Sequence, residues 1–201
     1  AKTEYCESVA VDFNAEIKKV VTSCGDYHAK SVIIASGADP RKLGIDGEEK
    51  LIGRGIHYCA HCDGRFYKDK TVAVVGGGNS AAADALYLSR LAKKVYLVHR
   101  RDSLRAEKIF VNALEKAENI EIIWNSEVGD ILSENKFCGV RLHSVLNKNY
   151  EDVYADGLFV SVGRTPATGL FAGQVFLDNN GYIIADESTK TNVKGVFAAG
   201  D

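Results

Sequence analysis

Methionine is absent from this sequence, and proline and tryptophan are nearly so. The 201 residues contain no Met, one Trp and two Pro. A complete gene product would normally begin with Met, and the apolar run that ends at Gly200 and Asp201 has no closing helix after it. We therefore expect a fragment or an incomplete chain, so that a motif missing at either end carries little weight.

Long apolar runs and a strong net charge are also missing. No run approaches the roughly 20 apolar residues of a transmembrane helix, and the first residues do not resemble a signal peptide. The formal net charge of -2 gives no reason to propose a nucleic acid or a membrane as partner. Hydrophobic residues make up 46% of the sequence, enough for a real core. We expect one large or two small domains in a cytoplasmic protein.

The cysteines lack the pattern of a secreted disulfide framework. There are five, an odd number, and Cys6, Cys24 and Cys138 are widely scattered. Only Cys59 and Cys62 are close in sequence, as a Cys-x-x-Cys that puts two sulfurs within bridging reach. In an intracellular protein such a pair is more often catalytic or metal-binding than structural.

The neighbours of this dithiol suggest chemistry as well. Asp63 directly follows the second cysteine and could relay a proton, because disulfide reduction consumes protons as well as electrons. His61 is most simply a solvent-facing spacer that could tune a thiol.

Zinc is the main alternative for this segment. His57, Cys59, His61 and Cys62 are all metal-ligand types, but a closed structural site usually joins two ligand pairs across a longer loop. No second Cys or His pair appears in the sequence, so a redox dithiol is favoured and no metal is expected. A pair of inert buried thiols is the remaining alternative.

A short apolar strand then leads into a glycine-rich turn. Gly76-x-Gly78-x-x-Ala81 fits the dinucleotide fingerprint: the first glycine permits the tight turn, the second admits a pyrophosphate, and the alanine allows close packing. Asn79 and Ser80 begin a helix whose free N–H groups would face the phosphates. The context favours dinucleotide binding over a merely structural turn.

The next predicted strand ends in cations. It closes at His99 and is followed by Arg100, Arg101 and Arg105, where sites for NAD usually carry an acid. An Arg fork can hold a 2′-phosphate with charge-assisted hydrogen bonds. These residues therefore favour NADPH over NADH, and a solvated basic stripe neutralised by nearby acids is the alternative.

The remaining pattern alternates strands and helices, as in an α/β fold. The composition of residues 40–55, with a proline and four glycines among charges, is typical of a linker. Helices are predicted at 79–93 and 106–117, single strands at 31–37, 71–75, 95–99, 120–124 and 155–163, and two strands between 128 and 145.

Together these motifs resemble the low-molecular-weight thioredoxin reductases. Members of this family are flavoproteins that carry electrons from NADPH through FAD to a Cys-x-x-Cys and on to thioredoxin. The similarity runs through the whole chain. Its most specific parts are Cys59–Gly64, Gly76–Ala81, His99–Ala106 and Gly195–Asp201.

The resemblance implies a domain organisation. A Rossmann-like, three-layer α/β domain for NADPH, residues 43–165, would be inserted into a partial FAD-binding domain of the same general type. Residues 1–42 and 166–201 would be the two parts of that outer domain. The family is commonly dimeric, so we expect a homodimer at full length.

The resemblance also implies roles for single residues. Cys62 would be the sulfur next to the flavin, Cys59 the one that exchanges with thioredoxin, and Asp63 the acid. The three arginines would hold the 2′-phosphate. The FAD would be lined by Ser36, Gly37, Gly200 and Asp201.

One position points to a different acceptor. The family typically has Thr where this chain has His61, and the flavoprotein of the alkyl hydroperoxide reductase system often has His there. That relative generally uses NADH and lacks the His-Arg-Arg run, so the arginines favour thioredoxin reductase. An electron donor to a peroxidase or another dithiol acceptor stays open as an alternative. A non-catalytic NADP-binding or zinc-binding module is the alternative from another class.

Overall fold

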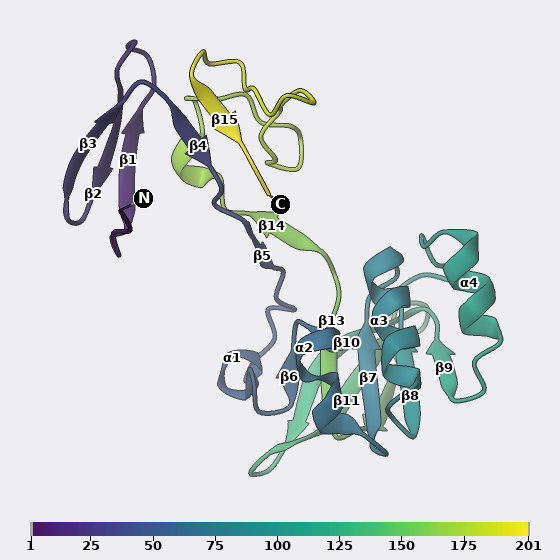
Figure 1. Ribbon diagram of the computed structural model, residues 1–201. Coiled ribbons are helices and arrows are strands. Elements are labelled where there is room, and N and C mark those ends of the chain that lie inside the picture. Colours follow the sequence, from purple (N-terminus) through teal and green to yellow (C-terminus); the bar gives the residue numbers. More distant parts are fainter. Residues whose placement is uncertain (1, 201) are drawn as a thin grey trace. The chain divides into compact units, whose positions relative to one another are not determined.

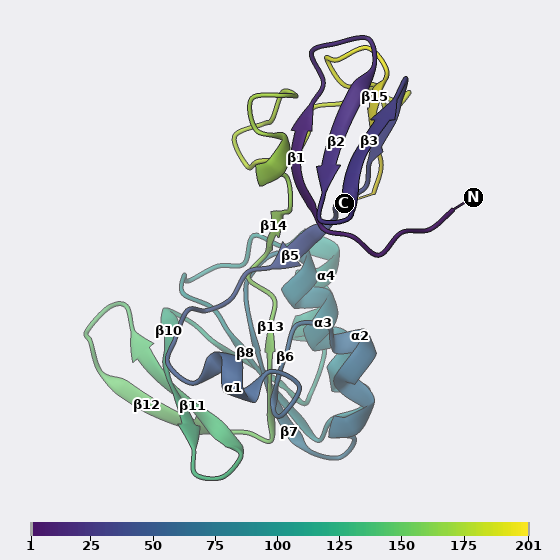
Figure 2. The same cartoon turned by 90° about the vertical axis from the view of Figure 1, so that its left-hand side faces the viewer.

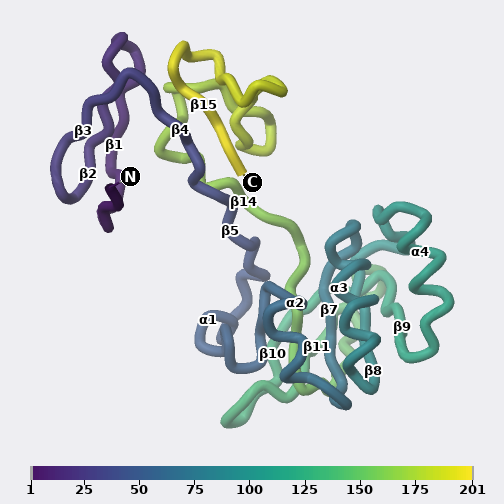
Figure 3. Tube along the Cα trace, viewed as in Figure 1, coloured from purple at the N-terminus to yellow at the C-terminus, as the bar shows by residue number. Residues whose placement is uncertain are grey.

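The computed structural model describes residues 2–200, which divide into two compact units. The central unit is Pro40–Gly163, and the outer unit combines Ala1–Asp39 with Arg164–Asp201. Figure 3 shows the outer unit built from both ends of the chain, purple and yellow. No helix among residues 2–200 is long and apolar enough to cross a membrane. The assignment of NADPH and FAD to these units, with boundaries at 43 and 165, stays a prediction.

A five-stranded sheet forms the middle layer of the central unit, in the order β6-β13-β7-β8-β9 (Figure 1). Every neighbouring pair in it is parallel. Such sheets are covered on both faces, which explains the nearly continuous apolar sequences of these strands. The strands are β6 (Ile56–His57), β7 (Thr71–Val75), β8 (Lys94–Val98), β9 (Ile120–Ile123) and β13 (Gly157–Val160).

Helices cover one face of this sheet and an antiparallel three-stranded sheet covers the other (Figure 2). Successive side chains of β7 alternate between the two faces. Val72 and Val74 pack with Leu88 on the helix side, whereas Ala73 packs with Val140 on the other side. The helices are α3 (Asn79–Ser89) and α4 (Lys108–Glu115), and the antiparallel strands are β10 (Ser126–Ser133), β11 (Phe137–Ser144) and β12 (Tyr150–Tyr154).

Short helical turns complete the central unit. One precedes β6, and two follow it, the first of which carries the cysteine pair. These turns are α1 (Glu48–Leu51), α2 (Ala60–Asp63) and the 3-10 helix η1 (Gly64–Tyr67).

The outer unit consists of a three-stranded antiparallel sheet and two strand pairs around a small core. That core is formed by Phe13, Ile34, Val175 and Val196. The pair β4–β15 is parallel, so the carboxyl ends of these two strands meet. The elements are β1 (Ser8–Asp12), β2 (Lys18–Thr22), β3 (Gly25–Ala29), β4 (Val32–Ile34) with β15 (Val196–Ala198), β5 (Ala38–Pro40) with β14 (Arg164–Pro166), and the 3-10 helix η2 (Gly169–Phe171).

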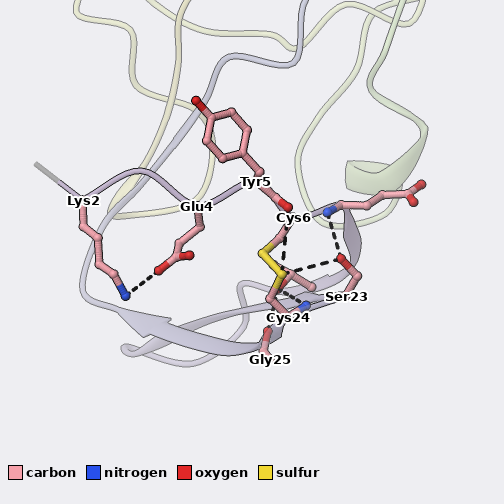
Figure 4. Close-up of a disulfide and its surroundings, with 9 residues drawn as sticks. Lys2, Glu4, Tyr5, Cys6, Ser23, Cys24 and Gly25 are labelled. Atoms are coloured by element: carbon pink, nitrogen blue, oxygen red, sulfur yellow. Dashed lines mark hydrogen bonds and ion pairs between the residues drawn. A yellow bond between two sulfur atoms is a disulfide. The ribbon is translucent and has the colours of Figure 1, made fainter.

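A disulfide joins Cys6 to Cys24, two cysteines whose spacing in the sequence does not predict a bond (Figure 4). It links the segment before β1 to the turn between β2 and β3. The same segments are joined by Ser23, whose N–H donates to Glu7 O at 2.9 Å, and by the Glu7 N–H, which donates to Ser23 Oγ at 3.1 Å. The antiparallel pairing of β1 with β2 brings the cysteines together, and sequence distance alone cannot reveal such a pairing.

The structure confirms the predicted strands and helices of the central unit, with ends shifted by a few residues. The predicted linker over residues 40–55 is wrong. This segment packs into the central unit around Glu48, whose side chain is 1% exposed. The carboxylate accepts from the N–H of Leu43 at 2.9 Å, from the N–H of Gly44 at 2.8 Å and from the hydroxyl of Tyr58 at 2.6 Å. Burial and this carboxylate both raise the pKa of Tyr58, so the phenol keeps its proton and donates.

We expect replacement of Glu48 to destabilise the central unit. Glu48→Ala removes the acceptor of three donors, and each donor left unsatisfied costs about 1–3 kcal/mol. Glu49→Ala is the matched control, because its side chain is 76% exposed and an exposed substitution changes stability by about 0.5 kcal/mol or less. Urea unfolding of the full-length protein measures both, and equal free energies of unfolding would contradict the assigned role.

We also expect the Cys6–Cys24 disulfide to stabilise the sheet β1–β3. The cysteines are 18 residues apart, and closing a loop of that size contributes about 3 kcal/mol. In Cys6→Ser/Cys24→Ser, amide hydrogen exchange should become faster in β1–β3 and remain unchanged in the central unit. Cys138→Ser replaces a cysteine that is not disulfide-bonded and serves as control. Unchanged exchange in the double variant would show that the disulfide is dispensable for this sheet.

Candidate functional site

A cavity of about 470 Å³ opens at the carboxyl edge of the parallel sheet. Its wall includes the turn after β7, the turn after β8 and the residues after β13. Ligands of open α/β sheets bind at such an edge. The lining residues include Gly76, Gly77, Gly78, Ser80, His99, Arg100, Arg105 and Ser161.

The three glycines of the turn meet different constraints. Gly76 has φ +151°, and an added Cβ would collide with Ser161 O and approach the Cβ of Ala81 to 2.7 Å. At Gly78 an added Cβ would meet nothing within 4 Å. Gly76 is therefore required by the close packing of β7, β13 and α3, and Gly78 leaves open space beside the backbone.

Gly77 is constrained by His99, a relation that the fingerprint does not contain. A Cβ at Gly77 would collide with the imidazole of His99, which is 6% exposed beneath the turn. Its Nε2 lies 3.1 Å from Ser103 O, and because a carbonyl only accepts, Nε2 is the donor. Burial and then the nearby arginines lower the pKa of His99. A neutral His99 thus supports the turn from below and forms part of the cavity wall.

Two of the three predicted arginines line the cavity. Arg100 also lies 3.8 Å from Glu127, and the Arg105 N–H donates to Gly77 O at 2.7 Å, which ties the basic segment to the glycine turn. Arg101 is exposed and, within residues 2–200, is not part of the wall. Two further cations in the wall, Arg41 and Lys42, were missed by the sequence analysis, because they precede the fingerprint by more than thirty residues and belong to no motif.

The two helix-start residues of the fingerprint differ in their contacts. Ser80 lines the cavity. Asn79 instead joins α3 to the start of α4: its amide donates to Glu107 Oε1 at 2.8 Å, and the Glu107 N–H donates to Asn79 Oδ1 at 2.8 Å. Asn79 therefore holds the helix that carries Ser80 and Ala81.

The predicted cysteines and acid lie together on one helical turn. Cys59 and Cys62 are disulfide-bonded. Cys59 is the N-cap of α2, and its sulfur accepts from the Cys62 N–H at 3.1 Å. The Asp63 N–H donates to Cys59 O at 3.1 Å. Cys62 is exposed and Cys59 half-buried, so a partner can approach the disulfide from solvent.

Asp63 contacts a buried histidine, His57, whose place in the sequence suggested only a zinc ligand. Its Oδ2 lies 3.1 Å from Nδ1 of His57, and Nε2 of His57 lies 2.7 Å from the hydroxyl of Tyr67. The position of Asp63 directly after Cys62 already suggested a role for this acid, but only the fold brings His57 and Tyr67 to it.

A second set of contacts links the dithiol turn to the cavity wall. His61 is 68% exposed, and its ring stacks on Tyr87 with centroids 4.2 Å apart. Its Nδ1 lies 4.0 Å from Asp84, which accepts from Ser161 Oγ at 2.6 Å. Burial raises the pKa of Asp84, and the contacts with Ser161 and His61 oppose that effect. Within residues 2–200 no group of His, Cys, Asp and Glu side chains could hold a metal ion.

The predicted FAD residues lie at the carboxyl ends of β4 and β15. Ser36 and Gly37 follow β4, and Gly200 follows β15, the parallel partner of β4. Gly37 has φ +74° and Gly200 has φ +88°, and an added Cβ at either would meet nothing within 4 Å. Asp201, the fourth predicted residue, lies outside the described residues.

Comparison with known proteins gives the same family as the motifs. Thioredoxin reductase of Streptomyces coelicolor is 46% identical over 195 residues, 96% of this chain and 61% of that protein. Thioredoxin reductase of Rickettsia conorii is 45% identical over 204 residues, 99% of this chain and 65% of that protein. The chain thus spans less than two thirds of these relatives.

Solved structures agree. The crystal structure of Lactococcus lactis thioredoxin reductase in its FR conformation has a TM-score of 0.87 and 37% identity, covering 98% of this chain and 66% of that one. Thioredoxin reductase of T. acidophilum has a TM-score of 0.85 and 34% identity, with the same coverage. These likenesses confirm the Rossmann-like α/β fold and the resemblance to thioredoxin reductases.

A family model covers almost all of the sequence. The model described as pyridine nucleotide-disulphide oxidoreductase matches residues 3–201. The chain belongs to the pyridine nucleotide-disulphide oxidoreductase family.

Proposed function

We propose that the full-length protein is an NADPH-dependent, FAD-containing disulfide reductase that reduces thioredoxin or a similar small dithiol protein. The observation that carries this proposal is the shared edge of the parallel sheet. A cysteine pair follows β6 there, and a glycine-lined cavity with arginines follows β7 and β8. The thioredoxin reductases among its relatives support the choice of acceptor. We include a cytoplasmic location and a homodimer in the proposal, both by analogy with the family.

NADPH would occupy the cavity at this edge. Gly76, Gly78 and Ala81 let the pyrophosphate approach the start of α3, where Ser80 and free N–H groups face the cavity. Arg100 and Arg105 would hold the 2′-phosphate, with Arg101 at the exposed rim and His99 beneath the turn. Each charge-assisted bond contributes about 1.5–3 kcal/mol, so two favour NADPH over NADH by about a hundredfold or more.

FAD fits the residues predicted to hold it. The backbone at Gly37 and Gly200 is unobstructed at the meeting carboxyl ends of two parallel strands, the place where such folds bind ligands. Ser36, Gly37, Gly200 and Asp201 would bind it. When bound, FAD supplies the chemistry that converts a hydride from the nicotinamide into two electrons for the disulfide.

The residues of the dithiol turn have different roles in the exchange reaction. We assign Cys62 to the flavin side, Cys59 to exchange with the partner and Asp63 to proton transfer. Thiol–disulfide exchange proceeds through a mixed disulfide, so one sulfur must be reachable by another protein. The choice of Cys59 for this role rests on the resemblance to the family, because Cys62 is the more exposed of the two cysteines here. An electron donor to a peroxidase is the second candidate, and the observation in its favour is His61 in place of the usual Thr.

The dithiol mechanism predicts that flavin reduction and partner reduction can be separated. In full-length Cys59→Ser, NADPH should still reduce the flavin, whereas NADPH-driven reduction of thioredoxin should fall to background, because one sulfur cannot complete the exchange. Cys138→Ser is the control and should keep full turnover. Undiminished reduction of thioredoxin by Cys59→Ser would exclude this mechanism.

The arginines predict the choice between the two nicotinamide cofactors. Arg100→Ala and Arg105→Ala should each weaken NADPH binding by about tenfold to a hundredfold and leave NADH binding nearly unchanged. Arg101→Ala is the matched comparison and should have the smaller effect, because its side chain lies outside the cavity wall. Dissociation constants from titration measure this. Equal use of NADPH and NADH by the unmutated protein would instead favour the peroxidase donor.

A further inference from the structure

A buried imidazole next to the dithiol turn has a stacked aromatic ring on one face and a polar contact at each nitrogen. His57 is 6% exposed. Its ring stacks on Phe159 and meets Tyr67 edge-on, each with centroids 5.3 Å apart. Nδ1 contacts Asp63 and Nε2 contacts the Tyr67 hydroxyl. A ring enclosed in this way cannot turn without breaking both contacts.

Asp63, His57 and Tyr67 form a hydrogen-bonded chain, and its hydrogen bonds have a definite direction. A carboxylate only accepts, so Nδ1 of His57 carries a proton and donates to Asp63. In the neutral imidazole Nε2 is then the acceptor, and the Tyr67 hydroxyl donates to it. Burial, with the carboxylates of Asp63 and Asp156, raises the pKa of Tyr67. A cation also lies near Tyr67: Nζ of Lys70 is 5.4 Å from the centre of its ring.

The position of the chain links it to the reacting sulfurs. Asp63 closes the helical turn that carries both cysteines, and its side chain is 33% exposed. It is therefore the one member that reaches solvent, whereas His57 and Tyr67 are buried. Burying a polar pair costs free energy that an apolar pair would not, and this cost favours a role beyond packing.

We infer that His57 is a positioning residue for Asp63. His57 holds the carboxyl group of Asp63 at the dithiol turn, and it shares the proton that Asp63 passes to a departing sulfur. Tyr67 fixes the imidazole from the other side. This inference rests on the proposed function, because it assigns a proton source to the same exchange reaction.

The protons and electrons of the exchange balance with this pair. In the reduced enzyme Cys59 is a thiolate, and its former proton is held by Asp63 and His57 together: Nδ1–H of His57 faces Asp63, and Nε2–H donates to the Tyr67 oxygen, which accepts in this state. Attack by Cys59 on the partner disulfide breaks that S–S bond, and the departing thiolate takes the shared proton. Cys62 then gives its proton to the pair and attacks Cys59, and the second departing thiolate takes that proton. The enzyme dithiol loses two electrons and two protons, and the partner disulfide gains them.

The second disulfide of the protein, Cys6–Cys24, provides an internal reference for a test that needs neither NADPH nor thioredoxin. Dithiothreitol reduces both disulfides of the full-length protein, and quenched alkylation with mass spectrometry follows each one separately. Asp63 follows Cys62 directly in the sequence, whereas the Cys6–Cys24 disulfide belongs to the other compact unit and serves as the reference. In His57→Leu the rate at Cys59–Cys62, relative to that at Cys6–Cys24, should fall about tenfold or more, as expected when a general acid is impaired.

Three variants separate positioning from packing. His57→Asn retains a nitrogen donor near the place of Nδ1 but cannot take up a proton, so its relative rate should fall less than that of His57→Leu and recover as the pH is lowered. Tyr67→Phe removes only the outer hydroxyl and should lower the rate about twofold to tenfold. When NADPH drives the reduction of thioredoxin, His57→Leu should have a lower kcat than the unmutated protein. Its KM for thioredoxin and its rate of flavin reduction by NADPH should stay unchanged.

The outcomes distinguish this inference from the proposed function. Equal relative rates in the unmutated protein and His57→Leu overturn the inference, even if NADPH reduces thioredoxin normally. Equal losses in His57→Asn and His57→Leu at every pH also overturn it, because the role would then be packing alone. The protein could also fail to reduce thioredoxin while the variants still differ in their rates of reduction by dithiothreitol. That result would overturn the proposed acceptor and leave the assignment of His57 in place.

Discussion

The parallel pairing of β6, β13, β7 and β8 is the constraint on which both halves of the candidate site depend. In register, His57 pairs with Phe159, Val160 with Val75, and Val75 with Val98. Because the strands run the same way, the segments that follow them emerge at one edge of the sheet. The cysteine pair, the glycine turn and the basic segment therefore share an edge, although they lie far apart in sequence. The contact from Asp84 to Ser161 joins the dithiol side of this edge to the cavity.

Contiguous features of the site could be predicted from the sequence. The fingerprint Gly76–Ala81 and the segment Cys59–Asp63 each act within a few residues, so the order of residue types already encodes the geometry. Local rules also explain the strand β7, whose alternating side chains pack into two different cores. Such rules fail where function depends on a contact between segments. Gly77 shows this: the fingerprint leaves its position free, yet the ring of His99 beneath it excludes a side chain.

Composition gave a wrong prediction where a residue type that is usually exposed is buried in the fold. Glycines and charges made residues 40–55 resemble a linker, but one of those charges, Glu48, is the buried acceptor for the N–H groups of Gly44 and of Leu43, which lines the cavity. Cys6 and Cys24 were equally uninformative, since their bond depends on the pairing of β1 with β2. In both cases the deciding partner comes from a contact that no local pattern records.

His57 shows how a contact of this kind changes a chemical interpretation. In the sequence it stands two residues before a cysteine and qualifies as a zinc ligand. A ligand must offer a lone pair to the metal, and a neutral imidazole has only one. In the fold that lone pair, at Nε2, accepts from Tyr67, while Nδ1 donates to Asp63. Metal binding at Nε2 would have to displace the buried hydroxyl of Tyr67. The same two hydrogen bonds leave Asp63 as the end of the chain that faces solvent, where a proton can be exchanged with sulfur.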